Sequence, residues 1–449
     1  MLDARLCKGC ERCVEACAKR CLAIGLEIEP QTGLLPVALH LDECSSCGLC
    51  IDACPEPYGL RAESEPAELL RRPCRTSEPR AVPDEVLPLP ESGPLALKGN
   101  YASAVGALLA GCRHVFGYPI TPSTEGAELM AKLLPGLGGV FLQAVSEVAT
   151  VNHMYGCGGA GVRTMTFTSS PGFSLMLEGI SYMVGAEVPG VFVNVMRGGP
   201  GLGNIAPEQA DIKLACRGLG HGNTRAIVLA PATPQEMLDL TRLAFDLAFQ
   251  YRNPVVLLSD GYLGQMTGRV TLPPLAVKPG LPGWAVSGDA EHRGNLICSI
   301  HLSEADLEAH NVYLNGKFAR MAAAEQRADL FRCEDAEVLL VACNTPARMA
   351  KGAVQALRQQ GVRAGLFRPL TLWPFPIDAL LPLLGRARRI VVVEASPGQL
   401  EDELLLALAH AGARSYPEVE SVRRHGGVLP QAMEIVRRVL DGRERGVAA

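Results

Sequence analysis

The sequence predicts an α/β protein built around a parallel sheet. Three runs rich in β-branched residues, at 140–145, 163–168 and 191–195, alternate with two helix-like runs. This alternation is the βαβαβ pattern of a doubly wound parallel sheet. Polar residues follow the strands in turn: Glu147, then a Thr-Ser-Ser-Pro-Gly run, then Arg197. Because ligands of open α/β sheets bind at the carboxyl ends of strands, these residues predict a binding site.

Length and composition narrow the class of protein. A chain of 449 residues with 48% hydrophobic residues is long enough for about three domains. The 47 acidic and 42 basic residues give a net charge of −5, and the basic residues are scattered, which argues against a nucleic-acid partner. No apolar run approaches the ~18 residues of a membrane span, and the N-terminus lacks a signal-like segment. We therefore expect a soluble cytoplasmic protein with no membrane partner.

The cysteines are concentrated at the start of the chain. Ten of the 16 lie within the first 74 residues, and the other six are spread over the remaining 375. A disulfide framework would not cluster in this way in a large chain that lacks a secretion signal. Metal ligation in a reducing compartment is the better interpretation.

Eight of these cysteines form two runs with the spacing of a bacterial two-cluster ferredoxin. The runs are Cys7-x2-Cys10-x2-Cys13-x3-Cys17 and Cys44-x2-Cys47-x2-Cys50-x3-Cys54-Pro55. In this pattern the fourth cysteine of each run ligates the other cluster. We therefore assign one [4Fe–4S] cluster to Cys7, Cys10, Cys13 and Cys54, and the second to Cys44, Cys47, Cys50 and Cys17.

A zinc ribbon is the alternative, but it would use separate C-x2-C pairs rather than two runs of four. Ala18 departs from the ferredoxin pattern, which usually has proline there. The two remaining cysteines of this region, Cys21 and Cys74, are predicted not to be ligands. Between the two runs, a hairpin is expected with its turn near Gln31-Thr32-Gly33.

The domain organisation follows from shifts in composition. Seven prolines between residues 61 and 94 predict an extended linker. A second βαβ pattern begins near residue 336, with strand-like runs around 338–343, 362–367 and 388–393. The expected parts are a small α+β cluster domain (1–60), the linker (61–94), the main α/β domain (95–270), a connector with a helical stretch (271–335) and a C-terminal α/β domain (336–449).

The candidate site residues each have an ordinary structural explanation when taken alone. Thr121 could cap the helix that follows it, and Glu147 could complement a helix dipole after an N-cap at Ser146. Arg197 could form a structural salt bridge. The G-x-G-x-x-A run at 201–206 resembles a dinucleotide fingerprint, but the next strand carries no acidic residue, so we reject NAD binding.

Seven motifs in order, from about residue 97 to the C-terminus, resemble the α subunit of 2-oxoacid:ferredoxin oxidoreductases, in the pyruvate:ferredoxin oxidoreductase superfamily. These are thiamine diphosphate enzymes. The motifs are GYPITPSTE, VSEVATVNHMYG, GVRTMTFTSSPGFSLMLEGISY, MRGGPGLGNIAPEQAD, YRNPVVLLSDGYLGQM, FRPLTLWPFP and VVVEASPGQL. The stretches RGGPGLGNI, HGNTRAIVLAP and EAHNVYLNGKF resemble the 2-ketoisovalerate type. The resemblance implies a pyrimidine-type thiamine-binding domain followed by a transketolase C-terminal-like domain.

The resemblance also implies roles for individual residues. Glu147 matches the glutamate that hydrogen-bonds the thiamine aminopyrimidine, which then removes the thiazolium C2 proton. Thr121 and Arg197 match groups that hold the carboxylate of the 2-oxoacid. Tyr118 and Pro119, in the same motif as Thr121, are expected to contact the cofactor. Coenzyme A is implied as the acyl acceptor.

One expected motif is missing. Thiamine enzymes bind the diphosphate through Mg²⁺ with a Gly-Asp-Gly motif and a later Asn, and Ser259-Asp260-Gly261 lacks that context. We therefore expect a partner β subunit to supply the diphosphate and Mg²⁺ half of the site. The resemblance further implies a γ subunit and a ferredoxin that accepts electrons.

Three functions remain open on the sequence alone. The first is oxidative decarboxylation of a 2-oxoacid to acyl-CoA and CO₂, with branched-chain acids preferred and 2-oxoglutarate, pyruvate or aryl 2-oxoacids as alternatives. The second is an electron-transfer or scaffold subunit with a degenerate thiamine site. The third is a non-redox thiamine lyase, which would have no use for iron–sulfur clusters.

Overall fold

The computed structural model describes residues 1–449 except 57–58, 63–78, 293 and 448–449. The chain forms two compact units, Met1–Glu78 and Pro79–Ala449. Each unit is described by itself. Cys74, predicted not to be a ligand, lies outside the described residues.

The first unit is a small α+β fold. Its elements are a 3₁₀ turn (Ala4–Leu6), α1 (Arg12–Ala16), β1 (Leu22–Ile24), β2 (Val37–Leu39) and α2 (Leu49–Asp52). β1 and β2 pair antiparallel, with Leu22 opposite Leu39. Between them Gly33 has φ +68°, a conformation that glycine adopts without steric cost, so the turn lies where the sequence predicts it.

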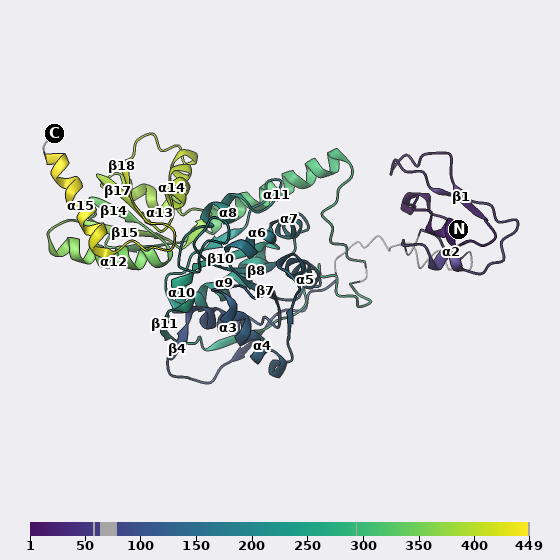
Figure 1. The fold of residues 1–449 in the computed structure, drawn as a ribbon, viewed down its shortest axis with the longest axis horizontal. Helices are drawn as coiled ribbons and strands as arrows, with labels where there is room; N and C mark the ends of the chain where they lie inside the picture. The colour runs from purple at the N-terminus through teal and green to yellow at the C-terminus, as the bar shows by residue number, and fades with distance from the viewer. Residues whose placement is uncertain (57–58, 63–78, 293, 448–449) are drawn as a thin grey trace. The chain divides into compact units, whose positions relative to one another are not determined.

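A seven-stranded sheet forms the centre of the second unit (Figure 1). The strands in spatial order are β16 (Thr371–Trp373), β9 (Ile227–Leu229), β10 (Pro254–Asp260), β8 (Gly190–Met196), β7 (Thr164–Thr168), β5 (His114–Gly117) and β6 (Val140–Gln143). All neighbours are parallel except β16, which pairs antiparallel with β9. The three strands read from the sequence are thus β6, β7 and β8. The edge strand β16 was not expected, because it comes from the segment assigned to the C-terminal domain.

Helices cover both faces of this sheet. One face packs against α3 (Gly99–Leu109), α4 (Thr124–Leu133) and α9 (Pro234–Tyr251), and the other against α5 (Glu147–Gly159), α6 (Ser170–Leu175), α7 (Leu177–Gly185) and α8 (Ile212–Arg217). Figure 1 shows α6 and α7 on one side of β8 and β7, with α3 and α4 on the other. Successive residues of β8 alternate between the two cores: Val191 and Val193 face one, Phe192 faces the other. Burial on both faces explains why the strands read as continuous apolar runs.

The C-terminal part of the second unit carries its own five-stranded sheet. Its order is β13 (Ala328–Phe331), β15 (Ala364–Pro369), β14 (Val338–Val341), β17 (Arg389–Glu394) and β18 (Glu418–Arg423). Its helices are α12 (Asn344–Gln359), α13 (Ile377–Leu384), α14 (Gln399–His410) and α15 (Ala432–Val447). Apolar residues of α13 and α14 join the same core as α5 to α8, so the two sheets share one hydrophobic core.

The predicted linker and connector contain more structure than expected. In the linker, β3 (Glu85–Pro88) pairs with β12 (Leu275–Lys278) of the connector, and just after the linker β4 (Leu95–Lys98) pairs with β11 (Thr267–Val270) within the main domain. From Pro79 the linker therefore belongs to the second unit. The connector contains α11 (Glu304–Ala324) and the strand β13. The short α10 (Gly261–Gln265) and a 3₁₀ turn (Pro135–Leu137) complete the unit.

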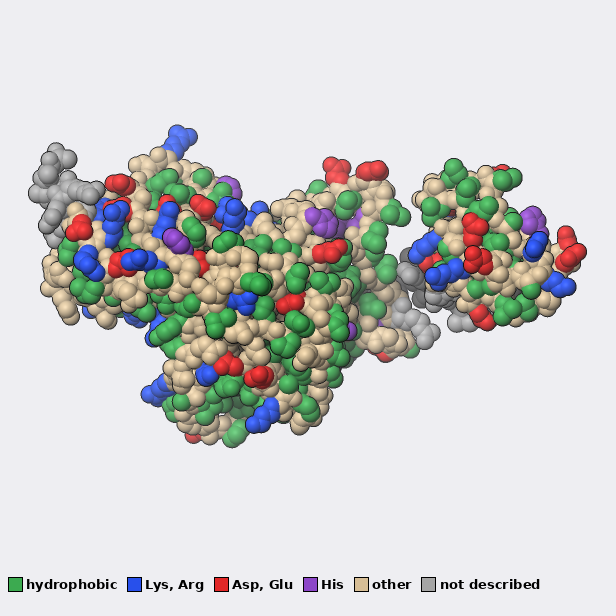
Figure 2. Space-filling view, viewed as in Figure 1, with side chains coloured by type: hydrophobic (Ala, Val, Ile, Leu, Met, Phe, Trp, Pro, Cys, Tyr) green, Lys and Arg blue, Asp and Glu red, His purple; other side chains and the backbone are tan. Residues whose placement is uncertain are grey.

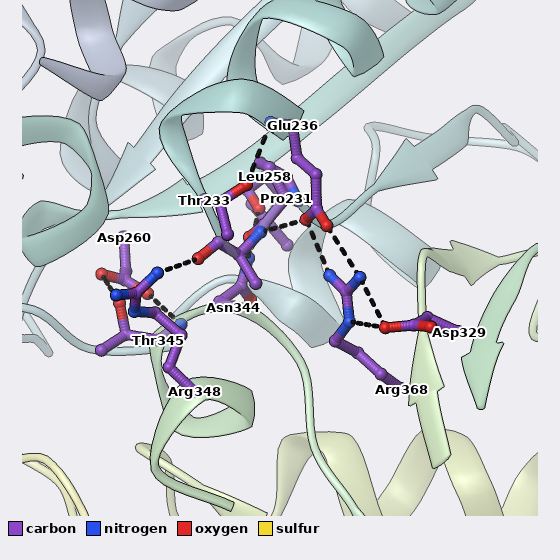
Figure 3. A network of polar contacts seen from close by, with 11 residues as sticks. Pro231, Thr233, Glu236, Leu258, Asp260, Asp329, Asn344, Thr345, Arg348 and Arg368 are labelled. Atoms are coloured by element: carbon purple, nitrogen blue, oxygen red, sulfur yellow. Dashed lines mark hydrogen bonds and ion pairs between the residues drawn. The ribbon is translucent and has the colours of Figure 1, made fainter. Parts of the chain in front are cut away.

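A buried polar network joins the two sheets where β10 ends (Figure 3). Asp260 accepts hydrogen bonds from the backbone N–H of Thr345 (2.9 Å) and from its hydroxyl (2.8 Å). Asn344 donates to the carbonyls of Leu258 (2.8 Å) and Pro231 (3.1 Å). These bonds place the start of α12 against the carboxyl end of β10.

The surface shows no face of a single charge in the view of Figure 2. Lys and Arg side chains lie among Asp and Glu over the C-terminal sheet and its helices. Within the described parts of the chain, no helix is both long and apolar enough to cross a membrane.

Candidate active site

The predicted site residues follow three of four adjacent strands. In the sheet, β7 lies between β5 and β8, and β6 is on the other side of β5. Thr121 follows β5, Glu147 follows β6, and Arg197 follows β8. The carboxyl ends of parallel neighbours meet at one edge, so the fold brings these three residues to the same edge of the sheet.

Glu147 is the first residue of α5 and is only 5% exposed. Ser146 has extended backbone angles, and its Oγ accepts a hydrogen bond from the N–H of Ala149 (3.2 Å), so it is the N-cap that the sequence predicts. A carboxylate in the first turn is favoured by the helix dipole. The Glu147 side chain points toward Gly172: a β-carbon at Gly172 would lie 2.5 Å from Glu147 Oε1.

The end of β7 adds three hydroxyl groups to the site. Thr168 and Ser169 are fully buried, and neither hydroxyl has a hydrogen-bond partner among the described residues. Ser169 occupies the N-cap position of α6 but makes no capping hydrogen bond. The third hydroxyl, Ser170 Oγ, accepts from the backbone N–H of Arg197 (3.1 Å). Unpaired buried hydroxyls are costly, so two in succession mark a place for a polar ligand.

Arg197 and Thr121 are in direct contact. Arg197 Nη1 donates to the carbonyl of Thr121 (2.8 Å), and Nη2 donates to the carbonyl of Leu202 (3.2 Å). The buried Nε has no partner in the described part of the chain. Two of the five guanidinium N–H groups thus orient the side chain, and the Nε–H and one N–H on each Nη remain for a ligand.

The capping role considered for Thr121 is wrong. The helix α4 begins at Thr124, with Ser123 as the residue before it, so Thr121 lies three residues outside the helix. Thr121 is exposed in the loop between β5 and α4, as are Tyr118 and Pro119. These two predicted cofactor contacts therefore share a loop with Thr121 at the carboxyl edge of the sheet.

Two buried carboxylates that the sequence analysis missed support the segment after Arg197. Glu208 Oε2 accepts from the N–H of Gly199 (3.1 Å), and Asp211 Oδ2 accepts from Asn194 Nδ2 (2.9 Å). Burial raises the pKa of Asp211, which hydrogen bonds from Ser170 and Asn194 partly offset. The PEQAD motif around them was visible, but nothing in its spacing showed that it folds back beneath Arg197.

In the first unit, the eight predicted cluster ligands divide between two cavities. One is lined by Cys7, Cys10, Cys13 and Cys54, and the other by Cys17, Cys44, Cys47 and Cys50. Backbone N–H groups of Val37, Cys21 and Ser46 donate to the sulfurs of Cys7, Cys17 and Cys44, at 3.3 to 3.4 Å. The two sets are the ones that the crossed ferredoxin pairing predicts.

Cys21 lines the second cavity without belonging to either run. It is 3% exposed, and burial raises the pKa of its thiol to about 11. The thiol donates to the carbonyl of Lys19 (3.7 Å). Burial also raises the pKa of Cys13 and Cys50, which are assigned as ligands, so the statement that Cys21 is not a ligand stays a prediction.

Comparison with known proteins places the chain in a family. The ketoisovalerate oxidoreductase subunit VorB of Methanothermobacter thermautotrophicus is 45% identical over 345 residues, which cover 76% of this chain and 96% of that protein. Its counterpart from Methanothermobacter marburgensis is 46% identical over the same number of residues, and the match covers the same fractions of the two chains. The 2-oxoglutarate synthase subunit KorA of Archaeoglobus fulgidus is 40% identical over 314 residues, 69% of this chain and 90% of that one. The chain belongs to the 2-oxoacid:ferredoxin oxidoreductase family.

The models of three protein families together match most of the sequence of this oxidoreductase subunit. "Pyruvate flavodoxin/ferredoxin oxidoreductase, thiamine diP-bdg" matches residues 105–290, "Pyruvate:ferredoxin oxidoreductase core domain II" matches 336–435, and "4Fe-4S dicluster domain" matches 6–57. A solved 2-oxoglutarate:ferredoxin oxidoreductase from Magnetococcus marinus, with 2-oxoglutarate, coenzyme A and succinyl-CoA bound, superposes with a TM-score of 0.69 at 25% identity. The match covers 78% of this chain and 65% of that one.

The residues of this oxidoreductase subunit fit the cofactors of its family. At the carboxyl edge of the main sheet, the buried carboxylate of Glu147 and the unpaired hydroxyls of Thr168 and Ser169 are polar groups that a bound cofactor would leave less exposed to an apolar interior. In the first unit, each set of four cysteines surrounds a cavity. The match of residues 6–57 to a 4Fe-4S dicluster domain favours two iron–sulfur clusters over a zinc ribbon.

Proposed function

We propose that this chain is the α subunit of an oxidoreductase that converts a branched-chain 2-oxoacid and coenzyme A to acyl-CoA and CO₂. The electrons pass through the two [4Fe–4S] clusters of the first unit to a ferredoxin. The substrate preference is supported by relatives: the two named for ketoisovalerate are 45% and 46% identical, and the one named for 2-oxoglutarate is 40% identical.

The observation that carries the proposal is the position of Glu147, buried at the start of α5 beside two unpaired hydroxyls. Thiamine diphosphate, when bound, supplies the carbanion that attacks the 2-oxo carbon and holds the electron pair that CO₂ leaves behind. Glu147 accepts a hydrogen bond from the aminopyrimidine ring and so helps it to take up a proton. Burial of Glu147 strengthens this bond.

Arg197 binds the carboxylate of the 2-oxoacid. Its Nη1 and Nη2 each donate one N–H to the carbonyls of Thr121 and Leu202, which leaves the unpaired Nε–H and the second N–H of each Nη for the substrate. A guanidinium–carboxylate hydrogen bond is charge-assisted and directional, so it fixes the 2-oxo carbon relative to the cofactor. Thr121 shares this role by orienting Arg197 and by lying at the same edge.

A β subunit completes the site. The carboxyl edge of the sheet is bordered by exposed apolar side chains: Val145 (87% exposed), Leu202 (80%), Ile205 (62%) and Val148 (44%). Apolar side chains gathered at a functional edge are typical of a protein interface. The partner supplies the diphosphate and Mg²⁺ half-site that this sequence lacks, and a γ subunit belongs to the same complex. The reduced cysteines that the clusters need are the reason to place the complex in the cytoplasm.

Viologen reduction by the anaerobically purified complex tests the proposal. Branched-chain, aryl and dicarboxylic 2-oxoacids and pyruvate are compared, each with and without coenzyme A. The fastest coenzyme A-dependent reduction is expected with 2-ketoisovalerate. A faster reaction with 2-oxoglutarate would overturn the substrate assignment. No reduction by any acid, with clusters and thiamine diphosphate loaded, would favour the electron-transfer subunit. Decarboxylation without viologen reduction would favour the lyase.

A further inference from the structure

The face of β7 that α5 covers carries three threonines at alternate positions, Thr164, Thr166 and Thr168. The helix runs back along this face from Glu147, near the carboxyl end of the strand, toward Cys157. Cys157, in the last turn of α5, lies close to Thr164. Thr168 therefore lies opposite the first turn of α5, where Glu147 is.

The distances place the hydroxyl of Thr168 near the carboxylate of Glu147. A β-carbon at Gly172 would lie 2.5 Å from Thr168 Oγ1 and 2.5 Å from Glu147 Oε1. Two atoms that are each 2.5 Å from one point are no more than about 5 Å apart. Gly172 leaves open the space between them, which a side chain would fill.

Other partners for this hydroxyl are few. Thr168 is fully buried, and its Oγ1 makes no hydrogen bond within the described residues. The nearby Ser170 hydroxyl is already used, since it accepts from the backbone of Arg197. A buried hydroxyl that lies this close to a buried carboxylate gains most by donating to it, because hydrogen bonds to charged groups are the strongest.

We propose that Thr168 is a positioning residue that acts through Glu147. Its hydroxyl donates to the Glu147 carboxylate when the cofactor is bound, which keeps the other carboxylate oxygen directed at the aminopyrimidine. The inference rests on the role proposed for Glu147. Loss of the hydroxyl slows removal of the thiazolium C2 proton, and it leaves the Arg197 contact with the substrate untouched.

Thr168→Val tests this in the assembled complex, with Thr168→Ser to restore the hydroxyl. Thr166→Val is the matched control, because Thr166 is also fully buried on the same face of β7 but two residues farther from the site. The readouts are the dissociation constant of thiamine diphosphate, the C2-proton exchange rate of the bound cofactor, kcat, the KM for the 2-oxoacid, and the melting temperature.

We expect Thr168→Val to lower the exchange rate and kcat by about 10- to 100-fold, as for a lost hydrogen bond to a charged group. The KM for the 2-oxoacid should change less than about twofold, and the thiamine diphosphate dissociation constant should rise. Thr168→Ser should recover most of both rates, and Thr166→Val should leave them unchanged.

Equal effects of Thr168→Val and Thr166→Val, or an unchanged exchange rate in Thr168→Val, would overturn the inference. Glu147→Gln separates this failure from failure of the proposed function. If Glu147→Gln abolishes exchange and Thr168→Val does not, only the role of Thr168 is wrong. If Glu147→Gln exchanges at the normal rate, the role of Glu147 is wrong, and the role of Thr168 is wrong with it.

Discussion

Two clusters of polar residues lie at the carboxyl edge of the main sheet, and they differ in how their hydrogen bonds are satisfied. At the end of β10, Asp260 accepts from the backbone N–H groups of Tyr262 (3.1 Å), Leu263 (3.0 Å) and Thr345 (2.9 Å), and from the hydroxyl of Thr345 (2.8 Å). Figure 3 shows Asp260 beside Thr345 at the start of α12. The Asp260 carboxylate is thus fully paired, although the hydroxyl of the neighbouring Ser259 is not, whereas at the ends of β7 and β8 Thr168, Ser169 and Arg197 each retain an unpaired buried atom.

The comparison teaches that burial of a polar residue does not by itself mark a ligand site. Asp260 and Glu147 are both buried acids that follow strands of the same sheet. The hydrogen-bond partners of Asp260 all come from this chain. Asp260 therefore has a structural role, in which it holds the C-terminal sheet against the main sheet. The surroundings of Glu147 are left unsatisfied, as expected where a ligand supplies the missing partners.

The largest expected effect is that of Glu147→Gln in the assembled complex. Loss of the carboxylate should lower kcat by about 100- to 10,000-fold, the range for a group that assists proton transfer. The melting temperature should hardly change, because Glu147 supports no other described side chain. The matched change is Asp260→Asn, which places an N–H₂ group against backbone donors and should cost about 2 kcal/mol of stability. Similar melting temperatures for the two variants would contradict the distinction drawn between the clusters.

Arg197→Met should act on substrate binding more than on the cofactor. We expect the KM for the 2-oxoacid to rise about 10- to 100-fold, because a charge-assisted hydrogen bond to the carboxylate is lost. The dissociation constant of thiamine diphosphate should be unchanged, which titration of the complex with the cofactor can measure. If the dissociation constant of thiamine diphosphate rises and the KM for the 2-oxoacid does not change, Arg197 binds the cofactor rather than the substrate.

Gly172→Ala tests the space beside Glu147. The added β-carbon would lie 2.5 Å from both Glu147 Oε1 and Thr168 Oγ1, so the carboxylate must move, and kcat should fall about 10-fold or more. Gly156→Ala is the control within α5, since nothing lies within 4 Å of its β-carbon position. That change should leave kcat unaltered and stabilise the helix by up to about 1 kcal/mol. Equal kcat values for the two variants would show that a β-carbon at position 172 does not disturb the Glu147 carboxylate.

The smallest effect concerns the contact between α8 and α14. Burial raises the pKa of Glu403 to about 7, although Arg217 lies 2.7 Å from it. The folded state therefore holds a proton that the unfolded state releases near pH 4.5, so this contribution to stability is lost as the pH rises from about 4.5 through 7. Glu403→Gln should make the fall in melting temperature over that range shallower. An unchanged slope would show that Glu403 ionises normally.

The sequence was informative wherever a residue's role depends on its neighbours along the chain. The strands β6, β7 and β8, the N-cap Ser146 and the position of Glu147 were all read from local pattern. The cysteine spacing likewise predicted which cysteines share a cavity.

The features that could not be predicted from the sequence depend on contacts between segments that are far apart along the chain. The edge strand β16 comes from residues that local pattern assigns to another domain. Asp211 reaches the site only because the chain after Arg197 folds back. The open hydrogen bonds of Thr168 and Ser169 can be recognised only once every neighbouring donor and acceptor is placed. Local spacing cannot show this, because the hydroxyl of an N-cap serine ordinarily accepts a hydrogen bond from a backbone N–H of its own helix.

The most direct test of the account is a spectroscopic one. The complete complex, loaded with thiamine diphosphate, is mixed anaerobically with 2-ketoisovalerate and coenzyme A without an external acceptor, and electron paramagnetic resonance follows the [4Fe–4S] clusters. The account predicts reduced clusters in the native complex after about one native turnover time, and none above background in Glu147→Gln at the same time point. Full cluster reduction in Glu147→Gln would contradict it, because the electrons would then have a source other than the site at the carboxyl edge of the main sheet.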